Sequence, residues 1–330
     1  MQRILQARHH RYALRRPFRI SRGVKTSADV ISVTLRQGNA VGRGEGVPYP
    51  RYGESIDSAL AAIEAIRPAI EGGADREALQ KLFSPGAARN AIDCAMWDLE
   101  ARLFGVDVAA TVGGAEPGPV ASALTISLDV PAAMGAVAAQ VAKAPLIKVK
   151  VDAIEPIAQI RAVRAAAPTA ALIVDPNESW DEALVRTMEA MLVEARVALL
   201  EQPVPAGADE WLEGYSSAVP ICADESFHVA DDVAVVARRY GVVNIKLDKT
   251  GGLTAALDAA QAARAAGLGL MTGCMVSSSL SIAPALHLAM RSDFVDLDGP
   301  LWLADDWAGG VRDEEGFLVP PDQGFWGQAQ

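Results

Sequence analysis

Cysteine and histidine are scarce in this chain of 330 residues, which holds three cysteines and four histidines. Cys94, Cys222 and Cys274 lie far apart and form no CxxC pair, which excludes the disulfide framework of a small secreted domain. The histidines show no zinc-like spacing. They are His9, His10, His228 and His287. We therefore expect a protein of the reducing cytoplasm.

Positive charge, aromatic residues and long apolar runs are also limited. The formal net charge is −11, which argues against a nucleic-acid partner or an anionic membrane surface. No apolar run approaches the ~20 residues that span a bilayer. Aromatic residues make up 5% of the chain and hydrophobic residues 51%, so we expect a core built mainly of Ala, Val, Leu and Ile.

The start of the chain is the exception to this acidity, since seven arginines fall within the first 22 residues. Such a start is typical of a transit peptide or of an arm that binds nucleic acid. The stretch has few serines and runs directly into a strand-like segment, and the rest of the chain is strongly acidic. We therefore favour neither interpretation.

The first third of the chain has an α+β pattern. A β-branched strand is followed by a glycine-rich stretch, a loop with two prolines and two helices. The segments, in order, are Ala28–Leu35, Gly38–Gly46, Pro48–Ser55, Ser58–Ile70 and Ala87–Leu103. The glycine- and proline-rich residues Gly113–Pro119 are the best candidate for a domain boundary.

Beyond that boundary, short apolar runs alternate with alanine-rich amphipathic stretches, as in a parallel sheet covered by helices. The strand-like runs are VASALTIS, PLIKVKV, AALIVD, RVALLE, PICADE, VVNIKL, LGLMT and FVDLD. Each run but the last precedes a predicted helix, including short ones near Asp209–Ser216 and Asp231–Tyr240. This order predicts an α/β fold with a TIM-like (β/α)7β barrel.

We therefore expect three parts in this chain. Residues 1–115 form an α+β capping domain, and residues 116–300 form the barrel. Residues 301–330 form a tail, because the segment after the last strand does not have a helical pattern. The tail is expected to return to the capping domain and complete it.

Charged residues recur in or at the ends of these strands, although strands covered by helices should be nearly all apolar. They are Lys148, Lys150, Asp175, Glu201, Asp224, Lys246, Asp296 and Asp298. From Lys150 to Lys246 the intervals are 25, 26, 23 and 22 residues. Because the carboxyl ends of barrel strands face one mouth, we expect these side chains to converge on one cavity.

The two lysines of the second strand share one face, and its β-branched residues share the other. An edge strand with its lysines in water would show the same alternation. The place of this run within a series of strands and helices favours lysines that point inward.

The carboxylates Asp175, Glu201 and Asp224 come from three consecutive strands. Three hard oxygen ligands suit Mg²⁺, with Mn²⁺ as a substitute. The alternative is that each carboxylate caps the helix after its strand. Capping explains one or two of them, but not why none of the three strand ends carries Ser, Thr or Asn.

Lys150 and Lys246 are expected on opposite sides of the barrel. Removing a proton next to a carboxylate builds a doubly charged enediolate, which a divalent metal stabilises electrostatically. A lysine must be neutral to act as the base, so its pKa has to fall from ~10.4 towards ~7–8, aided by nearby cations. One lysine on each face of the substrate predicts racemisation or epimerisation.

Motifs along nearly the whole chain carry a resemblance to a known family. They are PYPRYGES, GAARNAIDCAMWDLEAR, IKVKVD, IVDPNESW, LLEQPVP, CADES, NIKLDKTGGLT, GCM and DLDGP. The ordered set resembles the enolase superfamily in its muconate-lactonising subgroup. It is most similar to the dipeptide epimerases that interconvert L-Ala-L-Glu and L-Ala-D-Glu.

The resemblance implies an isomerase that binds one Mg²⁺ per subunit and acts in murein-peptide metabolism. Its metal ligands are Asp175, Glu201 and Asp224. Lys150 and Lys246 are then the acid/base catalysts, while Lys148 assists and contacts the substrate carboxylate. Lys249 is a rival to Lys246, but alternation places Lys246 on the inward face and Lys249 past the strand. We also expect a homo-oligomer whose binding partner is a small dipeptide.

The resemblance also implies how a dipeptide is held. Asp296 and Asp298 bind its free ammonium, which agrees with two carboxylates on one face, although an Asp turn at a strand end is the alternative. Lys25 stands where such epimerases carry an arginine for the glutamate side chain. Lysine neutralises a carboxylate without gripping it in two places. Thr125 and Tyr52 are further candidates for substrate contact, Tyr52 from a loop expected to close over the site.

Other functions remain open at this point. Within the same fold they are N-succinylamino acid racemase, o-succinylbenzoate synthase and muconate cycloisomerase, none of which needs two carboxylates to hold an ammonium group. From a different class, the chain could be a non-catalytic metal-binding relative. The intact pair of lysines argues against that alternative.

Overall fold

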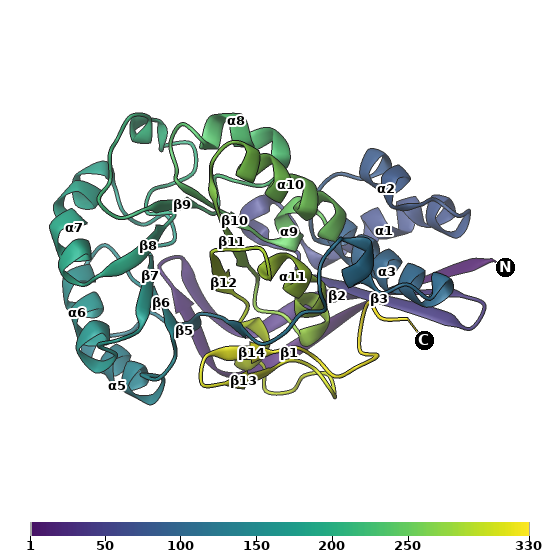
Figure 1. Ribbon diagram of the computed structural model, residues 1–330, viewed down its shortest axis with the longest axis horizontal. Helices are drawn as coiled ribbons and strands as arrows, with labels where there is room; N and C mark the ends of the chain where they lie inside the picture. Colours follow the sequence, from purple (N-terminus) through teal and green to yellow (C-terminus); the bar gives the residue numbers. More distant parts are fainter. Residues whose placement is uncertain (1, 330) are drawn as a thin grey trace.

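The computed structural model describes residues 2–329. Residues 2–115, called the capping region below, form an antiparallel sheet in the order β1-β2-β3 and a set of helices packed on it (Figure 1). Their bounds are β1 Arg3–Ile20, β2 Gly23–Gln37, β3 Ala40–Gly46, the 3-10 turn η1 Pro50–Tyr52, α1 Ile56–Glu71, α2 Arg76–Leu82, α3 Ala87–Phe104 and α4 Val108–Thr111.

The arginine-rich start of the chain is β1, which pairs with β2 over most of its length. The strand expected from Ala28 therefore begins earlier, at Gly23, and is the second half of a long hairpin. Leu5 is buried while Arg8 and Arg11 are exposed. Leu5 is the one buried residue of β1, so the strand accommodates many arginines along its length.

The glycine-rich stretch before Val47, to which the sequence pattern assigned no element, is a strand, β3 Ala40–Gly46. Gly42, Gly44 and Gly46 lie on one face of β3, against α3. A Cβ at any of them would overlap backbone atoms of the helix. The glycines therefore allow α3 to lie directly on the sheet, and this close approach outweighs the low strand preference of glycine.

Eight parallel strands form the second part of the molecule, in the order β5 to β12 around a barrel. They are β5 Leu124–Ile126, β6 Leu146–Lys150, β7 Ala171–Asp175, β8 Val197–Glu201, β9 Ile221–Ala223, β10 Val242–Ile245, β11 Gly269–Gly273 and β12 Phe294–Asp296. The ring closes where the Ala123 N–H donates to the Val295 carbonyl at 2.8 Å. The predicted barrel with an α+β cap is confirmed.

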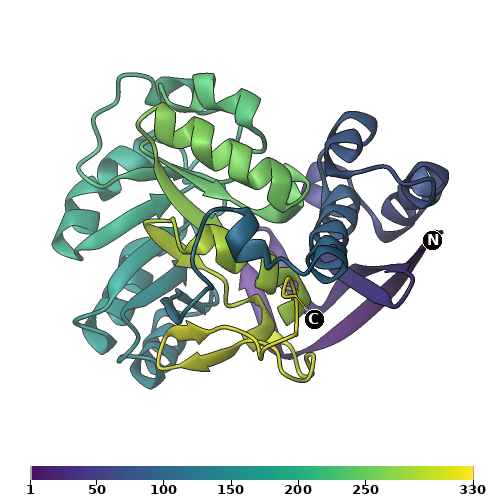
Figure 2. The same ribbon diagram turned by 45° about the vertical axis from the view of Figure 1, so that its right-hand side comes forward.

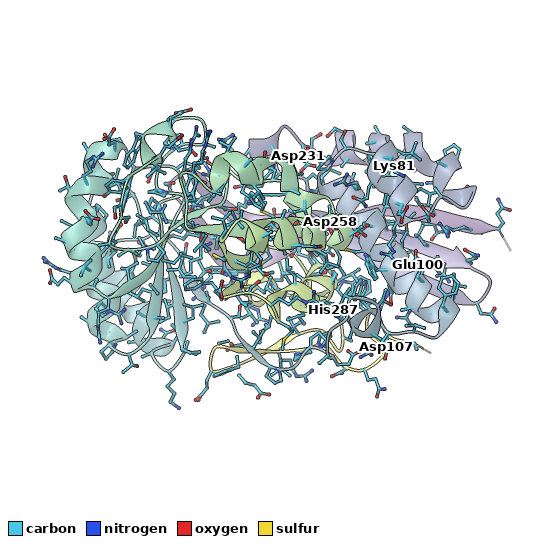
Figure 3. The ribbon with its side chains drawn as sticks, turned by 45° about the horizontal axis from the view of Figure 1, so that its top comes forward. Lys81, Glu100, Asp107, Asp231, Asp258 and His287 are labelled. Carbon is cyan, nitrogen blue, oxygen red and sulfur yellow. The ribbon has the colours of Figure 1, made fainter. Side chains whose placement is uncertain are left out.

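Helices cover the outside of this barrel (Figure 1). The longer ones are α5 Pro131–Gln140, α6 Pro156–Ala166, α7 Glu182–Glu194, α10 Leu253–Ala265 and α11 Ser279–Ala289. Their charged side chains point away from the core, as Figure 3 shows for Asp258, and for Lys81 and Glu100 of the capping region. Among the described residues no helix is long and apolar enough to cross a membrane.

Three connections differ from the expected helices. The segment after β8 holds only the 3-10 turn η2 Glu210–Leu212, between glycines with positive φ at Gly207 (83°) and Gly214 (79°). The segment after β9 holds η3 Ala230–Asp232 and the single turn α8 Val233–Val236. A further turn, α9 Leu247–Thr250, follows β10 and was not predicted. One turn is too short to leave a periodic pattern.

The tail runs back towards the capping region (Figure 2). After the 3-10 turn η4 Gly299–Trp302, strands β13 Arg312–Glu314 and β14 Phe317–Val319 form a small sheet with β4 Val120–Ala121. Further on, the Trp326 indole N–H donates to the Arg43 carbonyl of β3 at 2.9 Å.

A small apolar cluster fills the inside of the barrel below its polar end. Its buried members are Ala123, Leu146, Ile173, Leu199, Cys222, Val242 and Met271. These residues lie before the charged residues of their strands. The cluster therefore closes the barrel at the amino ends of the strands and leaves the carboxyl ends for a site.

Candidate active site

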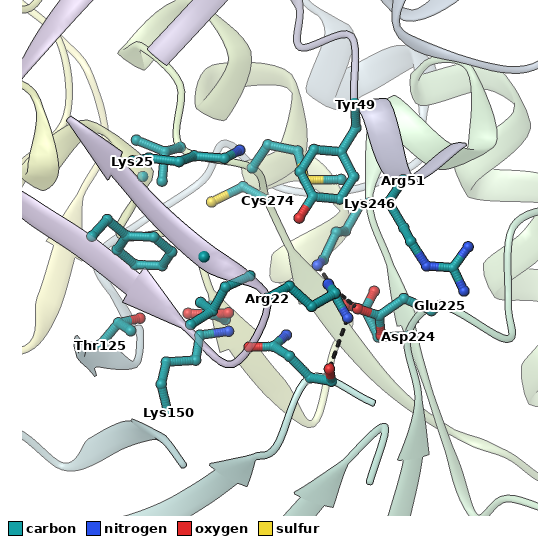
Figure 4. A pocket seen from close by; sticks show the side chains of 18 of the residues that line it. Arg22, Lys25, Tyr49, Arg51, Thr125, Lys150, Asp224, Glu225, Lys246 and Cys274 are labelled. Atoms are coloured by element: carbon teal, nitrogen blue, oxygen red, sulfur yellow. Dashed lines mark hydrogen bonds and ion pairs between the residues drawn. The ribbon is translucent and has the colours of Figure 1, made fainter. Parts of the chain in front are cut away.

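A cavity of about 510 Å³ lies between the carboxyl ends of the barrel strands and the capping region. Predicted residues on its wall are Lys25, Tyr52, Thr125, Lys148, Lys150, Asp224, Lys246, Asp296 and Asp298. Asp175 and Glu201 are fully buried and contact the lysines of this wall. Figure 4 shows Lys150 and Lys246 on different sides of the cavity, with Lys25 and Tyr49 above it. The structure therefore brings together every residue that the strand pattern selected.

Lys148 is the centre of the charged cluster. Its Nζ lies 2.7 Å from Glu201 Oε2, 2.7 Å from Asp296 Oδ2 and 3.1 Å from Asp175 Oδ2. Burial alone would lower the pKa of Lys148. The surrounding carboxylates outweigh burial and raise this pKa well above its ordinary value. Lys148 is therefore a fixed positive charge.

Lys150 and Lys246 each face one carboxylate. Lys150 Nζ lies 2.5 Å from Asp175 Oδ2, and Lys246 Nζ lies 2.7 Å from Asp224 Oδ2. The two lysines are carried by β6 and by the end of β10, four strands apart in a ring of eight. They therefore approach the cavity from opposite sides, as their strand numbers predicted.

Lys249 has a different environment from Lys246. Its Nζ donates to Asp224 Oδ1 at 2.7 Å and to the carbonyls of Asp224 and Asn244 at 2.5 and 2.9 Å. It does not line the cavity. Its three donors are thus used inside the protein, which favours Lys246 as the lysine that meets a substrate.

The pKa of Lys246 does not follow the expected direction. Burial lowers it, but Asp224 outweighs burial and raises it well above its ordinary value. We expected neighbouring cations to lower this pKa, and the paired carboxylate has the larger effect in this arrangement.

The three predicted metal ligands differ in their partners. Burial and, to a smaller extent, the neighbouring Asp175 raise the pKa of Glu201 to about 7. For Asp175 the effect of burial is outweighed by Lys150 and Lys148, and the pKa falls to about 2. Asn177 and Asn244 hold two of the carboxylates, since Asn177 N–H donates to Asp175 Oδ1 at 2.8 Å and Asn244 Nδ2 donates to Glu201 Oε1 at 2.9 Å.

These carboxylates suit a hard divalent cation by their chemistry, because all three are buried oxygen donors from neighbouring strand ends. Glu201 Oε2 has no hydrogen bond and meets only the ammonium of Lys148. Among residues 2–329 no three acidic, histidine or cysteine side chains are grouped as a metal site in the present arrangement. The lysine ammonium groups balance the negative charge of the carboxylates instead.

The last strand and the first strand meet at a second pair of carboxylates. Asp298 Oδ2 accepts a hydrogen bond from the Thr125 N–H at 2.7 Å, and Asp296 Oδ1 has no partner. Both side chains reach the cavity. Ser127, two residues after Thr125, contacts Arg19 and does not line the cavity.

The capping region contributes Lys25 near the tip of the β1–β2 hairpin and two tyrosines. Lys25 Nζ lies 4.6 Å from the ring centre of Tyr49, a cation–π contact, and burial lowers its pKa. Tyr49 and Tyr52 meet edge to face, with 5.3 Å between ring centres. The hairpin and loop are thus held together above the cavity.

Sequence reasoning missed the ion pairs that join this hairpin to the barrel. Arg22 donates to Glu178 Oε2 at 2.8 Å and to Glu225 Oε1 at 2.6 Å, and Arg51 pairs with Glu178 at 2.8 Å. Both arginines are therefore occupied, which leaves Lys25 as the cation of this wall without a carboxylate partner among the described ion pairs. Glu178 and Glu225 each follow a predicted metal ligand closely, and that position was the only available signal.

Family comparisons agree with this fold and site. Residues 129–325 match the enolase C-terminal domain-like family, and residues 4–113 match the mandelate racemase / muconate lactonizing enzyme N-terminal domain. The molecule is therefore a barrel enzyme of the isomerase class, of the racemase and epimerase type. The chain belongs to the mandelate racemase and muconate lactonizing enzyme family of the enolase superfamily.

Two characterised relatives are similar over most of their length. The L-Ala-D/L-Glu epimerase of Escherichia coli K12 is 46% identical, over 89% of this chain and 92% of the relative. The N-acetyl-D-glutamate racemase of a Pseudoalteromonas species is 41% identical, over 91% and 96%.

Two solved structures are also similar. An enolase family member from Agrobacterium tumefaciens with homology to dipeptide epimerases, with bound sodium and L-Ala-L-Glu, has a TM-score of 0.96 and 46% identity, covering 98% of this chain and all of that one (100%). The dipeptide epimerase of Enterococcus faecalis, complexed with Mg and L-Leu-L-Tyr, has a TM-score of 0.89 and 29% identity, covering 98% of each chain.

Proposed function

We propose that this enzyme is a dipeptide epimerase that inverts the α-carbon of the carboxyl-terminal residue. The observation that carries the proposal is the joint placement on one cavity of two lysines from opposite sides of the barrel and the carboxylates Asp296 and Asp298. The lysines serve proton transfer on two faces. The carboxylates serve a substrate with a free ammonium group.

In this scheme Lys150 and Lys246 exchange roles with the direction of the reaction. One lysine takes the α-proton from one face of the substrate, and the other returns a proton to the opposite face. Lys148, a fixed positive charge, attracts the substrate carboxylate and the negative charge that develops on it. The fixed placement of these groups around one cavity keeps the α-carbon between the two Nζ atoms.

Asp175, Glu201 and Asp224 would hold the Mg²⁺ that we propose as the cofactor. When bound, this ion supplies further positive charge for the developing negative charge on the substrate carboxylate. With Asp224 engaged as a metal ligand, its attraction for the Lys246 proton would be weaker, which would favour the base form of that lysine. The Mg complex of the E. faecalis epimerase supports this choice of metal.

Lys25 favours a dipeptide substrate whose second residue is acidic. It lies on the cavity wall in the capping region, and the arginines nearby are paired with Glu178 and Glu225. L-Ala-D/L-Glu, the substrate in the name of the E. coli relative, fits a cavity with one such cation. A place in murein-peptide metabolism agrees with this substrate.

The second candidate is a racemase of N-acylated amino acids, because one relative at 41% identity is an N-acetyl-D-glutamate racemase. Its substrate has no ammonium group. The buried and unpartnered Asp296 Oδ1 argues for the dipeptide, since an ammonium can partner this atom and an acetyl group cannot.

The test is incubation of the protein and Mg²⁺ with a library of L-Xaa-L-Xaa dipeptides and with N-acetyl amino acids in D₂O. We expect a mass gain of one deuterium and inversion in dipeptides, strongest where the second residue is Glu. Mass gain confined to the N-acetylated compounds would select the second candidate, and no gain in either group would refute both.

A further inference from the structure

Asp248 is a buried carboxylate of the barrel that accepts hydrogen bonds from the capping region. It lies on the turn α9, two residues after Lys246. Its Oδ1 accepts hydrogen bonds from the Val47 N–H and from Asn90 Nδ2, both at 2.8 Å. Val47 follows β3 and Asn90 lies on α3, so both donors belong to the capping region.

The neighbouring residue of α3 contacts the same turn. The Arg89 guanidinium donates to the carbonyl groups of Thr250 and Gly251. The turn itself closes on Lys246, whose carbonyl accepts the N–H groups of Lys249 and Thr250, both at 3.0 Å. Side chains of α3 therefore hold the turn that begins at Lys246.

The paired part of strand β10 ends one residue before Lys246. The last residue of β10 that pairs with a neighbouring strand is Ile245, opposite Thr272. Lys150, in contrast, lies within its strand and is paired with Asp175. The strand ladder thus places Lys150, whereas the placement of Lys246 depends on the turn that follows it.

Val47 also leads directly into the loop that carries Tyr49 and Tyr52, which line the cavity. Asp248 Oδ1, which accepts from both Val47 and Asn90, therefore sets the position of Lys246 relative to this loop. All the atoms that take part are buried, so water does not compete for these hydrogen bonds.

We propose that Asp248 is a positioning residue for Lys246, and that this junction with the capping region thereby controls one of the two proton-transfer steps and not the other. The inference rests on the proposed two-lysine epimerisation. Asp248 touches no substrate and acts only through the turn and the loop.

The test compares two substitutions at this site. Asp248→Leu removes the acceptor, and Asp248→Asn keeps an oxygen at the same position. For each epimer of the dipeptide, α-proton exchange in D₂O is followed by NMR. The exchange that Lys246→Ala abolishes defines the face served by Lys246. We expect Asp248→Leu to slow that exchange by roughly 10- to 100-fold, because small misplacements of a catalytic group have effects of this size. Exchange at the other face is expected to change little, and Asp248→Asn is expected to keep both exchange rates close to those of wild type.

A matched control comes from the same helix. Asp93 is also buried on α3 and also reaches the barrel, since its Oδ2 accepts from the Thr254 N–H at 3.0 Å, but its side-chain hydrogen bonds go to Gln80 and Thr254 and not to α9. Asp93→Leu is expected to change both exchange rates by the same factor. If Asp248→Leu does not fold, Asn90→Ala removes one of the two donors and is expected to give the same one-sided loss, smaller in size.

Equal losses at both faces in Asp248→Leu, or in Asn90→Ala where it replaces that variant, overturn the inference. The same one-sided loss in Asp93→Leu also overturns it. A wild-type enzyme that exchanges no dipeptide proton would refute the proposed function instead, so the two failures are distinct.

Discussion

The two halves of the barrel are supported differently, and each carries one of the proposed acid/base lysines. The half from β5 to β8 carries Lys150 and is covered by α5, α6 and α7, far from the helices of the capping region (Figure 1). The half from β9 to β12 carries Lys246, and its α9, α10 and α11 contact α3 or β3. The first half therefore places its lysine by strand pairing, and the second half depends on the capping region.

Buried polar groups make this second contact specific. Glu45 of β3 accepts two hydrogen bonds from Ser278 at the start of α11. The Ser278 N–H donates at 2.8 Å and the Ser278 hydroxyl at 2.6 Å. Asp93 of α3 accepts from the Thr254 N–H. Buried groups of this kind are costly when unpaired, so they fix one orientation of the capping region on the barrel. The comparison teaches that the helices of the capping region support the barrel on the Lys246 side, whereas the Lys150 side meets the β1–β2 hairpin and the loop after β3 through Arg22 and Arg51.

Removal of the lysine from either half of the barrel is expected to cause the largest loss of epimerisation. Lys150→Ala and Lys246→Ala each lose the acid or base of one face, and epimerisation should fall by on the order of 10⁴-fold. Each variant is expected to exchange the α-proton of one substrate epimer for deuterium. The epimer that exchanges in Lys150→Ala should be the opposite of the one that exchanges in Lys246→Ala. Proton NMR in D₂O measures both quantities. Full activity in either variant would contradict the two-lysine scheme.

Glu45→Gln tests the junction on the Lys246 side through stability. Burial raises the pKa of Glu45 from 4.5 to about 7, so the folded chain binds this proton more tightly than the unfolded chain. The resulting stability is present below pH 4.5 and is lost as the pH rises through about 7, a change of about 3 kcal/mol. Glutamine does not titrate and should lack this loss.

Urea unfolding at pH 5 and pH 8 checks the prediction for Glu45. The free energy of unfolding of wild type, measured relative to that of Glu45→Gln, is expected to be lower at pH 8 than at pH 5. Glu64→Gln is the matched control, because Glu64 pairs with Arg67 on α1, away from the barrel. An unchanged difference between wild type and Glu45→Gln would show that Glu45 titrates normally.

Asp298→Asn tests the seam where the two halves meet, since Asp298 of the last strand accepts the Thr125 N–H of the first. Asparagine keeps this acceptor and removes the charge. A charge-assisted hydrogen bond to an ammonium group contributes about 2 kcal/mol, so KM for a free dipeptide should rise on the order of 30-fold. An N-acetylated dipeptide should show no such change. Equal changes for both compounds would contradict the ammonium role.

Lys25→Met is expected to have the smallest effect, at the hairpin that lies over the mouth of the cavity. An ion pair near a protein surface contributes about 1 kcal/mol, so KM for L-Ala-L-Glu should rise roughly fivefold and KM for L-Ala-L-Leu should not. Because burial lowers the pKa of Lys25, the preference of wild type for Glu should weaken as the pH rises towards this pKa. Lys25→Arg should retain the preference. Steady-state kinetics with the two dipeptides at several pH values measures these effects.

Much of the site was predictable because it follows a short-range rule. Charged residues at intervals of one strand and one helix must reach the same end of a parallel barrel, and Asp175, Glu201 and Asp224 do so. Alternation within the strand also placed Lys148 and Lys150 on the inward face. These inferences need only the repeat and the direction of each strand.

The junction with the capping region was not predictable in the same way. Asp248 and its donors Val47 and Asn90 are 201 and 158 residues apart in sequence. No local pattern marks such a pair. The glycines of β3 likewise indicated no strand in the sequence, because what requires them is the helix α3 that packs on them.

The sequence by itself determined the barrel, its polar end and the set of lysines and carboxylates that meet there, since periodicity and strand direction are local properties of a chain. Only the tertiary structure decided which carboxylate pairs with which lysine, in which direction the pKa of Lys246 moves and which face of the site the capping region supports. These properties depend on distances of a few ångströms between segments far apart in sequence, where burial strengthens electrostatic interactions.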